Sequence, residues 1–159
     1  MQELIKKIEQ WAIDRELDKK ATIEAQSIKT AEEMAELIIG ISKDNIDVIK
    51  DSIGDVFVTL VIGNMIDEKL DINKMLYDTQ VDMHAEKKSV LIRNLGIKIM
   101  QIIDKGYREG VVLWLIKKLK DVCRAYNLKF TDCIEIAYNE IKDRKGKTID
   151  GQFIKESDL

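Results

Sequence analysis

None of the 159 residues of the chain is proline. Proline marks turns, strand edges and the first turns of helices, so its complete absence predicts long helices joined by short polar or glycine connections. The length corresponds to a single domain, residues 1–159, which is large enough to bury a core without disulfide or metal support. Hydrophobic residues recur at helical spacing, and no strand-type alternation persists. We therefore predict an all-α fold, an antiparallel bundle of about five to six helices.

The hydrophobic period and the capping residues place these elements along the chain. Helices are predicted over about 2–16, 22–43 and 46–68, then two that end near Gly106 and Asn127, and a last one that begins at Thr131 or Asp132. Polar breaks are predicted at Asp18–Lys20, Asp44-Asn45 and Lys69–Asn73. Residues 74–88 fit either a short helix or a loop, and the tail from Arg144 has no period. In the second helix, the predicted core stripe is Ile28, Ala31, Ala35 and Ile38.

Composition narrows the possible partners and location. The chain has 26 Lys and Arg against 29 Asp and Glu, a formal charge of −3, so we expect no nucleic-acid partner, because phosphate backbones select basic surfaces. The longest uncharged run is 56–66, too short to span a bilayer, and no signal peptide is evident. We expect a cytoplasmic protein with no membrane partner. Cys123 and Cys133 are predicted to be small buried residues, Trp11 and Trp114 core residues, and His84 is assigned no role.

Acidic residues interrupt the apolar pattern of the second and third helices. Glu33 and Glu36 lie about 60° apart on one helix face, and Asp51 and Asp55 about 40° apart on the next. If the two helices pack antiparallel across their short turn, the four carboxylates converge. Two carboxylates about 5 Å apart repel by about 3 kcal/mol at an effective dielectric of about 20, so the cluster needs counter-charge. Mg²⁺, with Mn²⁺ as an alternative, prefers such oxygen ligands; a solvated acidic face paired with lysines is the other interpretation.

These residues also form a recognisable pattern. The segment Lys29-x-x-x-Glu33-x-x-Glu36, followed by Asp51-Ser-Ile-Gly-Asp55, resembles the MazG-like nucleoside triphosphate pyrophosphohydrolases, an all-α family related to dimeric dUTPases. Its second motif places Glu three residues before the Asp, whereas this chain has Ser52 there. Asp51 is the candidate replacement. The resemblance extends to Trp11 and to the carboxyl-terminal segment with Asn139, Lys142, Arg144, Lys145, Lys147 and Gly151-Gln-Phe153.

The resemblance implies an activity, a cofactor and roles for individual residues. It implies Mg²⁺-dependent cleavage of a nucleoside triphosphate into monophosphate and pyrophosphate by a homo-oligomer, a dimer or a tetramer. The catalytic residues would be Glu33, Glu36 and Asp55, which with Asp51 would bind metal. The nucleotide would contact Lys29, Asn139, Lys142, Arg144 and Lys145. The alternatives are a catalytically weakened nucleotide-binding regulator, a helical interaction module and, least favoured, nucleic-acid binding through the basic tail.

Overall fold

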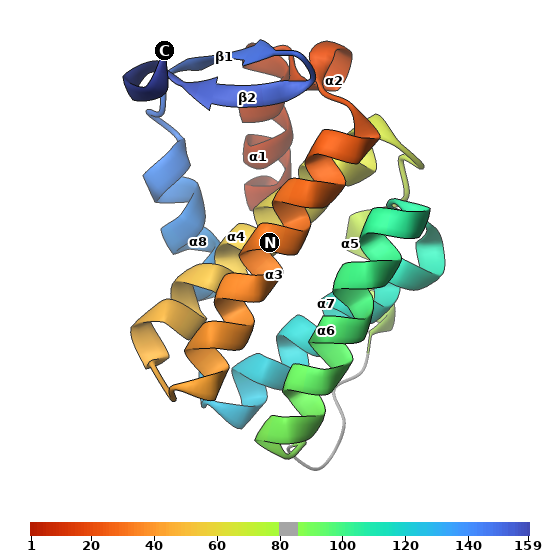
Figure 1. Ribbon diagram of the computed structural model, residues 1–159, viewed down its shortest axis with the longest axis vertical. Helices are drawn as coiled ribbons and strands as arrows, with labels where there is room; N and C mark the ends of the chain where they lie inside the picture. The colour runs from red at the N-terminus through yellow and green to blue at the C-terminus, as the bar shows by residue number, and fades with distance from the viewer. Residues whose placement is uncertain (80–85) are drawn as a thin grey trace.

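A computed structural model describes residues 1–79 and 86–159 and shows an all-α architecture with one small strand pair (Figure 1). The all-α prediction is confirmed. The described residues form eight helices rather than five or six, because the break at 18–20 is a short helix and part of 74–88 is helical. The helices are α1 (Gln2–Asp14), α2 (Leu17–Lys20), α3 (Ile23–Ser42), α4 (Ile46–Ile66), α5 (Ile72–Asp78), α6 (Lys88–Lys105), α7 (Glu109–Ala125) and α8 (Phe130–Ile141).

Helix α4 lies at the centre of the molecule and packs against α1, α3, α7 and α8. Its 21 residues are apolar on nearly every side, and 13 of them are buried. Helices α3 and α4 form an antiparallel hairpin in which side-chain caps fix both starts: Thr22 Oγ1 accepts from the amide of Ala25 at 3.1 Å, and Asn45 Oδ1 from that of Val48 at 3.3 Å. These caps satisfy amides that the first helical turn leaves unpaired. The hairpin aligns the two acidic segments.

Glycine at position 54 lets α8 approach α4 closely. A Cβ built on Gly54 would lie 2.3 Å from the carbonyl oxygen of Cys133 and 2.6 Å from Ala137 Cβ. Any larger residue would have to push the helices apart, since such distances are far inside van der Waals contact. The glycine therefore brings the carboxyl-terminal helix alongside the acidic turn of α4.

The carboxyl-terminal tail contains a β-hairpin, so the prediction that no sheet forms was wrong for this segment. Strands β1 (Gly146–Ile149) and β2 (Gln152–Lys155) pair antiparallel across Asp150 and Gly151, and a 3₁₀ turn (Glu156–Asp158) follows. Both turn residues have positive φ, 50° and 83°, as a two-residue Asp-Gly hairpin requires. The Gly151 carbonyl accepts from the Thr22 amide at 3.2 Å. The hairpin thereby docks on the start of α3, at the top of Figure 1, where it lies across the end of α1 and beside α2.

Burial on α3 differs from the predicted core stripe. Ile28 is 46% exposed and Ala35 is also exposed, whereas the buried side of the helix is shifted around its axis and carries Thr30, Met34, Leu37 and Ile41. Apolar residues therefore occupy both the inner and the outer face of α3. Of the predicted stripe, Ala31 is buried and Ile38 is partly buried against the core, whereas Ile28 and Ala35 face outward. The prediction was therefore half right, because periodicity alone does not reveal which face of the helix meets the core.

Several smaller predictions have clear outcomes. Cys123 and Cys133 are buried free thiols, as predicted, and Trp11 is a buried core residue whereas Trp114 is only partly buried. His84 lies outside the described residues. In the part of the chain that the structure describes, no helix is long and apolar enough to cross a membrane.

Candidate acidic site between the third, fourth and eighth helices

The α3 side of the site is a nearly buried carboxylate with its own counter-ion. Glu33 is 7% exposed, and its Oε1 lies 2.7 Å from Lys29 Nζ, one turn earlier. The same ammonium group lies 3.1 Å from Glu32 Oε2. Partial burial opposes the charge on Lys29, but the hydrogen bonds and charges of Glu33 and Glu32 outweigh it and raise the pKa of Lys29. Lys29 is therefore a fixed cation at the edge of the site.

The α4 side carries Asp55, whose carboxylate is the most perturbed acid of the site. Burial is the main cause, and the neighbouring charges of Glu33, Asp51 and Glu140 add to it, while Arg144 opposes them; together they raise the pKa of Asp55 to about 7. A carboxyl group that is surrounded by other acids and removed from water resists ionisation. The predicted convergence of α3 and α4 acids therefore holds for Glu33 and Asp55.

Asp51, one turn before Asp55 on α4, belongs to the same cluster. Burial and the charge of Glu140 raise the pKa of Asp51, with Arg144 acting in the opposite direction. Its Oδ1 atom is buried and has no hydrogen-bond partner among the described residues. Ser52, at the position where the resembled motif has an acid, is 2% exposed and packed into the core. Asp51, and not Ser52, faces the other carboxylates.

Helix α8 contributes Glu140 near its end, and Arg144 follows in the next segment. Sequence reasoning identified Arg144 but missed Glu140. The one sequence feature that could have pointed to Glu140 is its place one turn after Ala137, the residue that lies against Gly54. That feature is informative only once α8 is known to pack on α4. The site therefore combines four acids from three helices with one arginine from beyond the last helix.

Helix α1 anchors the segment that carries Arg144. Trp11 Nε1 donates to the Ile141 carbonyl at 2.7 Å, and the Arg15 guanidinium donates to the Arg144 carbonyl from Nε at 2.9 Å and from Nη2 at 2.6 Å. The guanidinium also stacks on the Trp11 ring, 4.4 Å from its centroid. These bonds satisfy the carbonyl of Ile141, the last residue of α8, and the carbonyl of Arg144 just beyond it, neither of which has a partner within the helix.

The other predicted site residues lie at the rim or outside it. Glu36 is exposed on α3 and is not among the charges that shift the pKa of Asp55, so its convergence with the other acids stays a prediction. Asn139 and Lys142 are exposed and bonded to each other, Nζ to Oδ1 at 3.1 Å. Lys145 and Lys147 are exposed on and before β1. Of the basic tail, Arg144 is the residue whose charge reaches Asp51 and Asp55.

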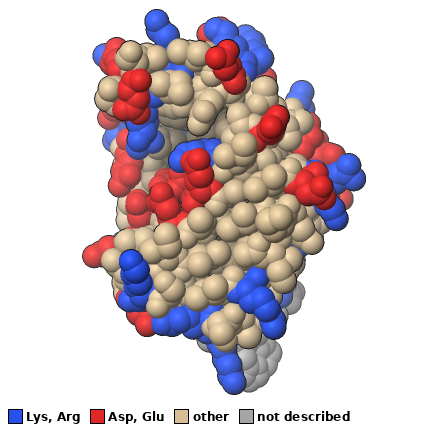
Figure 2. All heavy atoms as spheres, in the orientation of Figure 1, with Lys and Arg blue, Asp and Glu red and all other residues tan. Residues whose placement is uncertain are grey.

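Figure 2 shows acidic side chains gathered around a basic one in a hollow of the surface below the hairpin. The ligand atoms of this cluster are of the kind that Mg²⁺ prefers, because Mg²⁺ binds carboxylate oxygens and retains water. The Asp51 Oδ1 atom has no hydrogen-bond partner, so it is available as a metal ligand. The carboxylates are not spaced as a complete metal site: within residues 1–79 and 86–159, no three His, Cys, Asp or Glu side chains are grouped so that they could hold a metal ion. Any bound cation would need further ligands from water or substrate.

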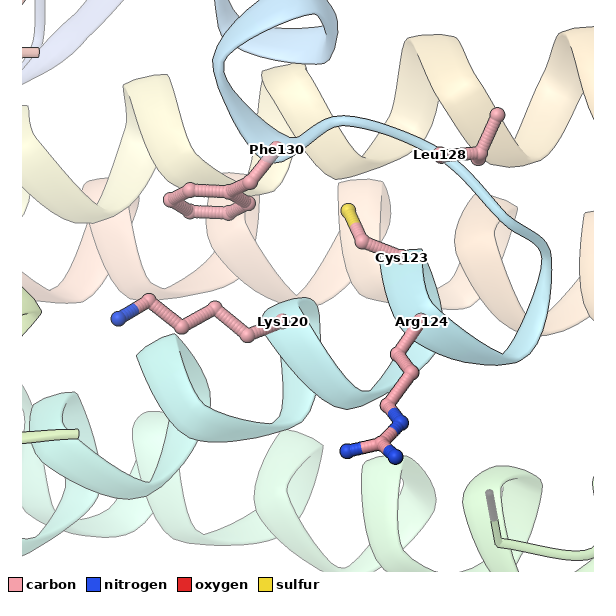
Figure 3. A pocket seen from close by; sticks show the side chains of 5 residues that line it. All are labelled: Lys120, Cys123, Arg124, Leu128 and Phe130. Carbon is pink, nitrogen blue, oxygen red and sulfur yellow. The ribbon is translucent and has the colours of Figure 1, made fainter. Parts of the chain in front are cut away.

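A second hollow lies on another part of the surface, between α7 and the start of α8. It encloses about 500 Å³ and is lined by Lys120, Cys123, Arg124, Leu128 and Phe130 (Figure 3). Lys120 Nζ already donates to the carbonyls of Leu76 and Thr79, so its charge serves to hold α5 against α7. None of these residues belongs to the acidic site.

Comparison with known proteins identifies a relative of almost equal size. An uncharacterized 18.2 kDa protein from the rep-hol intergenic region of Haemophilus phage HP1 (strain HP1c1) is 34% identical over 158 residues, which cover 86% of this chain and 97% of that protein. The chain belongs to the family of this phage protein. No protein-family model matches the chain, and no solved structure matches it significantly. The phage relative is described by its size and the position of its gene, so the function of this family must be argued from the acidic site.

Proposed function

We propose that the chain is a MazG-like, Mg²⁺-dependent cytoplasmic enzyme that hydrolyses nucleoside triphosphates to the monophosphate and pyrophosphate. The observation that carries the proposal is the environment of Asp55, a half-buried acid whose pKa is raised to about 7 by burial and by Glu33, Asp51 and Glu140. Four acids with only Lys29 and Arg144 beside them leave a net negative charge in one place, which favours a cation. A triphosphate is a polyanion and binds there together with that cation.

The residues divide into a metal-holding group and a phosphate-holding group. Glu33, Asp51 and Asp55 would hold the cation, with Glu140 beside them. A divalent cation in such a site neutralises phosphate charge and lowers the pKa of a bound water. Lys29 on α3 pairs with Glu33, and Arg144 after α8 acts on Asp51 and Asp55, so both cations border the acids and can contact phosphate oxygens. Arg144 offers two parallel N–H donors, whereas Lys29 acts as a point charge.

Ser52 stands where the MazG-like motif has a glutamate, and this difference is compatible with the proposal. Ser52 is packed in the core, and Asp51 stands one position earlier with a buried, unpartnered oxygen close to Asp55 and Glu140. We propose that Asp51 takes the role of the missing glutamate, from a position turned about 100° around the helix. Its carboxylate is one carbon shorter, so it reaches the site from a different direction.

A second candidate function is nucleotide binding without turnover, as in a regulator. Two observations favour it: the described carboxylates do not form a group of three metal ligands, and Glu36 is exposed at the rim. A protein that binds the triphosphate through one weakly held cation would retain the contacts of Lys29 and Arg144 with phosphate but would not hydrolyse the triphosphate. The two candidates share the site and differ in the rate of pyrophosphate release.

A nucleotide panel tests the proposal. The chain is incubated with the common ribo- and deoxyribonucleoside triphosphates in Mg²⁺ and in Mn²⁺, and pyrophosphate is measured. We expect turnover of at least one nucleotide, reduced at least about 100-fold in Asp55→Asn and Glu33→Gln, while Glu135→Gln, an exposed acid on α8, retains it. Nucleotide binding in calorimetry without pyrophosphate release would support the regulator. If the chain neither binds nor hydrolyses any nucleotide, the proposal is overturned and a helical interaction module is the remaining interpretation.

A further inference from the structure

The two cysteines of the chain meet between α7 and α8. Cys123 lies in the last turn of α7 and Cys133 in the first turn of α8, and both are buried, 3% and 0% exposed. Their thiols hydrogen-bond to each other, and both are free thiols. Two sulfur atoms in hydrogen-bond contact need only a small movement to form a covalent bond.

The connection between the two helices holds the cysteines in this arrangement. The chain turns through Asn127, whose φ of 53° lies in the left-handed region that asparagine tolerates. The Leu128 amide donates to the Cys123 carbonyl at 2.7 Å, and the Cys133 amide donates to the Lys129 carbonyl at 3.3 Å. Main-chain hydrogen bonds therefore fix both sides of a tight turn, and a bond between the sulfurs would close the short ring of residues 123–133.

One of the two thiols can be reached from solvent. Cys123 lines the hollow between α7 and the start of α8. In Figure 3 its sulfur points away from the Arg124 side chain, toward the connection that leads into α8. Cys133, in contrast, is completely buried. A small molecule that enters the hollow therefore meets Cys123 first.

The hydrogen bond makes the two thiols chemically different. It lowers the pKa of Cys133, with support from the charge of Lys50 on α4, while burial and Asp132 act in the opposite direction. The same hydrogen bond, together with burial, raises the pKa of Cys123. The pair therefore ionises at Cys133. Because the thiolate is the nucleophile in thiol–disulfide exchange, Cys133 is poised to attack a sulfur that is bound to Cys123.

We propose that Cys123 and Cys133 are a reversible oxidation site, at which a small-molecule disulfide that enters the hollow converts the two thiols into a disulfide bond between α7 and α8. Cys123 passes its proton to Cys133 and attacks one sulfur of the small disulfide, which leaves a mixed disulfide on Cys123 and releases one thiolate. That thiolate takes the proton from Cys133. The Cys133 thiolate then attacks the Cys123 sulfur and releases the second thiolate, which takes a proton from water. Two electrons pass from the protein to the small disulfide, which becomes two thiols.

The bond would tie the first turn of α8 to α7 where α8 meets α4, because the Cys133 carbonyl oxygen is the atom that lies against Gly54. In a reducing compartment the dithiol is the resting form, and the bond forms when the ratio of disulfide to thiol rises. Since a cross-link restrains the unfolded chain, oxidation should raise the midpoint of urea denaturation by about 0.5–1 M. Equal midpoints for the oxidised and reduced protein would contradict this restraint. The inference is independent of the proposed enzymatic function.

Intact mass spectrometry of the folded protein after incubation with oxidised glutathione tests the proposal. The wild type should lose two hydrogen atoms and retain no glutathione, and dithiothreitol should restore the original mass. Circular dichroism confirms that the protein is folded during the reaction. A folded wild type that keeps two thiols open to alkylation after denaturation, or that accumulates a glutathione adduct, would overturn the proposal.

Single substitutions test the order of attack. Cys133→Ser should retain glutathione on Cys123, because the second thiol is missing. Cys123→Ser should react at least about tenfold more slowly, because its remaining thiol is completely buried. Cys133→Ala and Cys123→Ala repeat the comparison without a buried hydroxyl group, in case a serine variant does not fold. Equal rates of adduct formation in the two single variants would overturn the assignment of Cys123 as the thiol that reacts first.

Discussion

Arg15 and Arg144 are joined by two hydrogen bonds although they lie 129 positions apart, and the guanidinium of the first holds the backbone carbonyl of the second. The bond geometry fixes the main chain of Arg144, and the side chain of Arg144 stands near Asp51 and Asp55. Arg15 is therefore a positioning residue. It acts on the acidic site through the backbone that carries the site's arginine.

Replacing Arg15 should weaken both the fold and the anion site. We expect Arg15→Met to lower the free energy of unfolding by about 1–3 kcal/mol, the range for hydrogen bonds from a charged donor, and to reduce affinity for inorganic pyrophosphate in Mg²⁺. Urea denaturation and calorimetric titration measure the two effects. Arg108→Met, at an exposed position before α7, is the control. Unchanged pyrophosphate affinity in a folded Arg15→Met protein would contradict the positioning role.

The raised pKa of Asp55 makes stability depend on pH. Below about pH 4 the carboxyl is protonated in both the folded and unfolded states. Between about pH 4 and 7 the unfolded chain loses this proton while the folded chain retains it, so the free energy of unfolding of the metal-free protein falls as pH rises. Above about pH 7 the loss is complete, and we expect it to amount to about 4 kcal/mol at most, since one pKa unit corresponds to about 1.4 kcal/mol.

Denaturation in chelator at a series of pH values measures this loss. Asp55→Asn should remove the fall between pH 4 and 7 and should be more stable than the wild type at pH 8. Asp132→Asn, which replaces an exposed acid in the first turn of α8 outside the cluster, should retain the wild-type slope. Parallel curves for wild type and Asp55→Asn would show that Asp55 titrates normally.

Mg²⁺ should stabilise the protein where the cluster is ionised. A ligand that binds only the folded state stabilises it by mass action, about 2.7 kcal/mol at 100 times its dissociation constant. At pH 8 we expect the unfolding temperature to rise with Mg²⁺ concentration in the wild type and in Glu135→Gln, and to stay constant in Asp51→Asn/Asp55→Asn. A wild-type curve that does not respond to Mg²⁺ or Mn²⁺ would mean that the acids are only a charged surface.

The close approach of α4 and α8 predicts a large effect for a single methyl group. Gly54→Ala places a Cβ 2.3 Å from the carbonyl oxygen of Cys133, so the helices must separate, at a cost of about 1–3 kcal/mol. Glu140 and Arg144 then move away from Asp55. Gly110→Ala, where the added Cβ meets nothing within 4 Å, is the matched control and should be neutral or slightly stabilising. Equal stability of the two variants would contradict the packing.

Local signals predicted the starts of α3 and α4 well, whereas α8 begins at Phe130 and not at the predicted Thr131 or Asp132. Thr22 and Asn45 lie at or beside predicted boundaries, and both act as side-chain caps in the structure. Capping is a contact between neighbours in sequence, so the sequence carries it directly. The Asp150-Gly151 pair was also a local signal for a hairpin turn, but the four-residue strands around it are too short to show a convincing alternation.

The site depended on contacts that sequence spacing does not reveal. The pairing of Glu33 with Asp55 follows from one short turn between two helices and was predicted. Glu140 enters the cluster because α8 packs on Gly54, and that contact joins segments more than 70 residues apart. The exposure of Glu36 was missed for a related reason: its helix has apolar residues on both faces, and the sequence does not say which face the rest of the chain covers.

The anchoring of the last helix and the hairpin on α1 and on the start of α3 has a consequence for synthesis. A ribosome adds residues at about 5–20 per second from the amino-terminal end, so Glu33, Asp51 and Asp55 emerge well before Glu140 and Arg144. Until then the acids of α3 and α4 have Lys29 as a neighbouring cation but lack Arg144, and Trp11 and Arg15 lack their carbonyl partners. The nascent chain therefore completes its charged centre only when its final segment closes over helices made first.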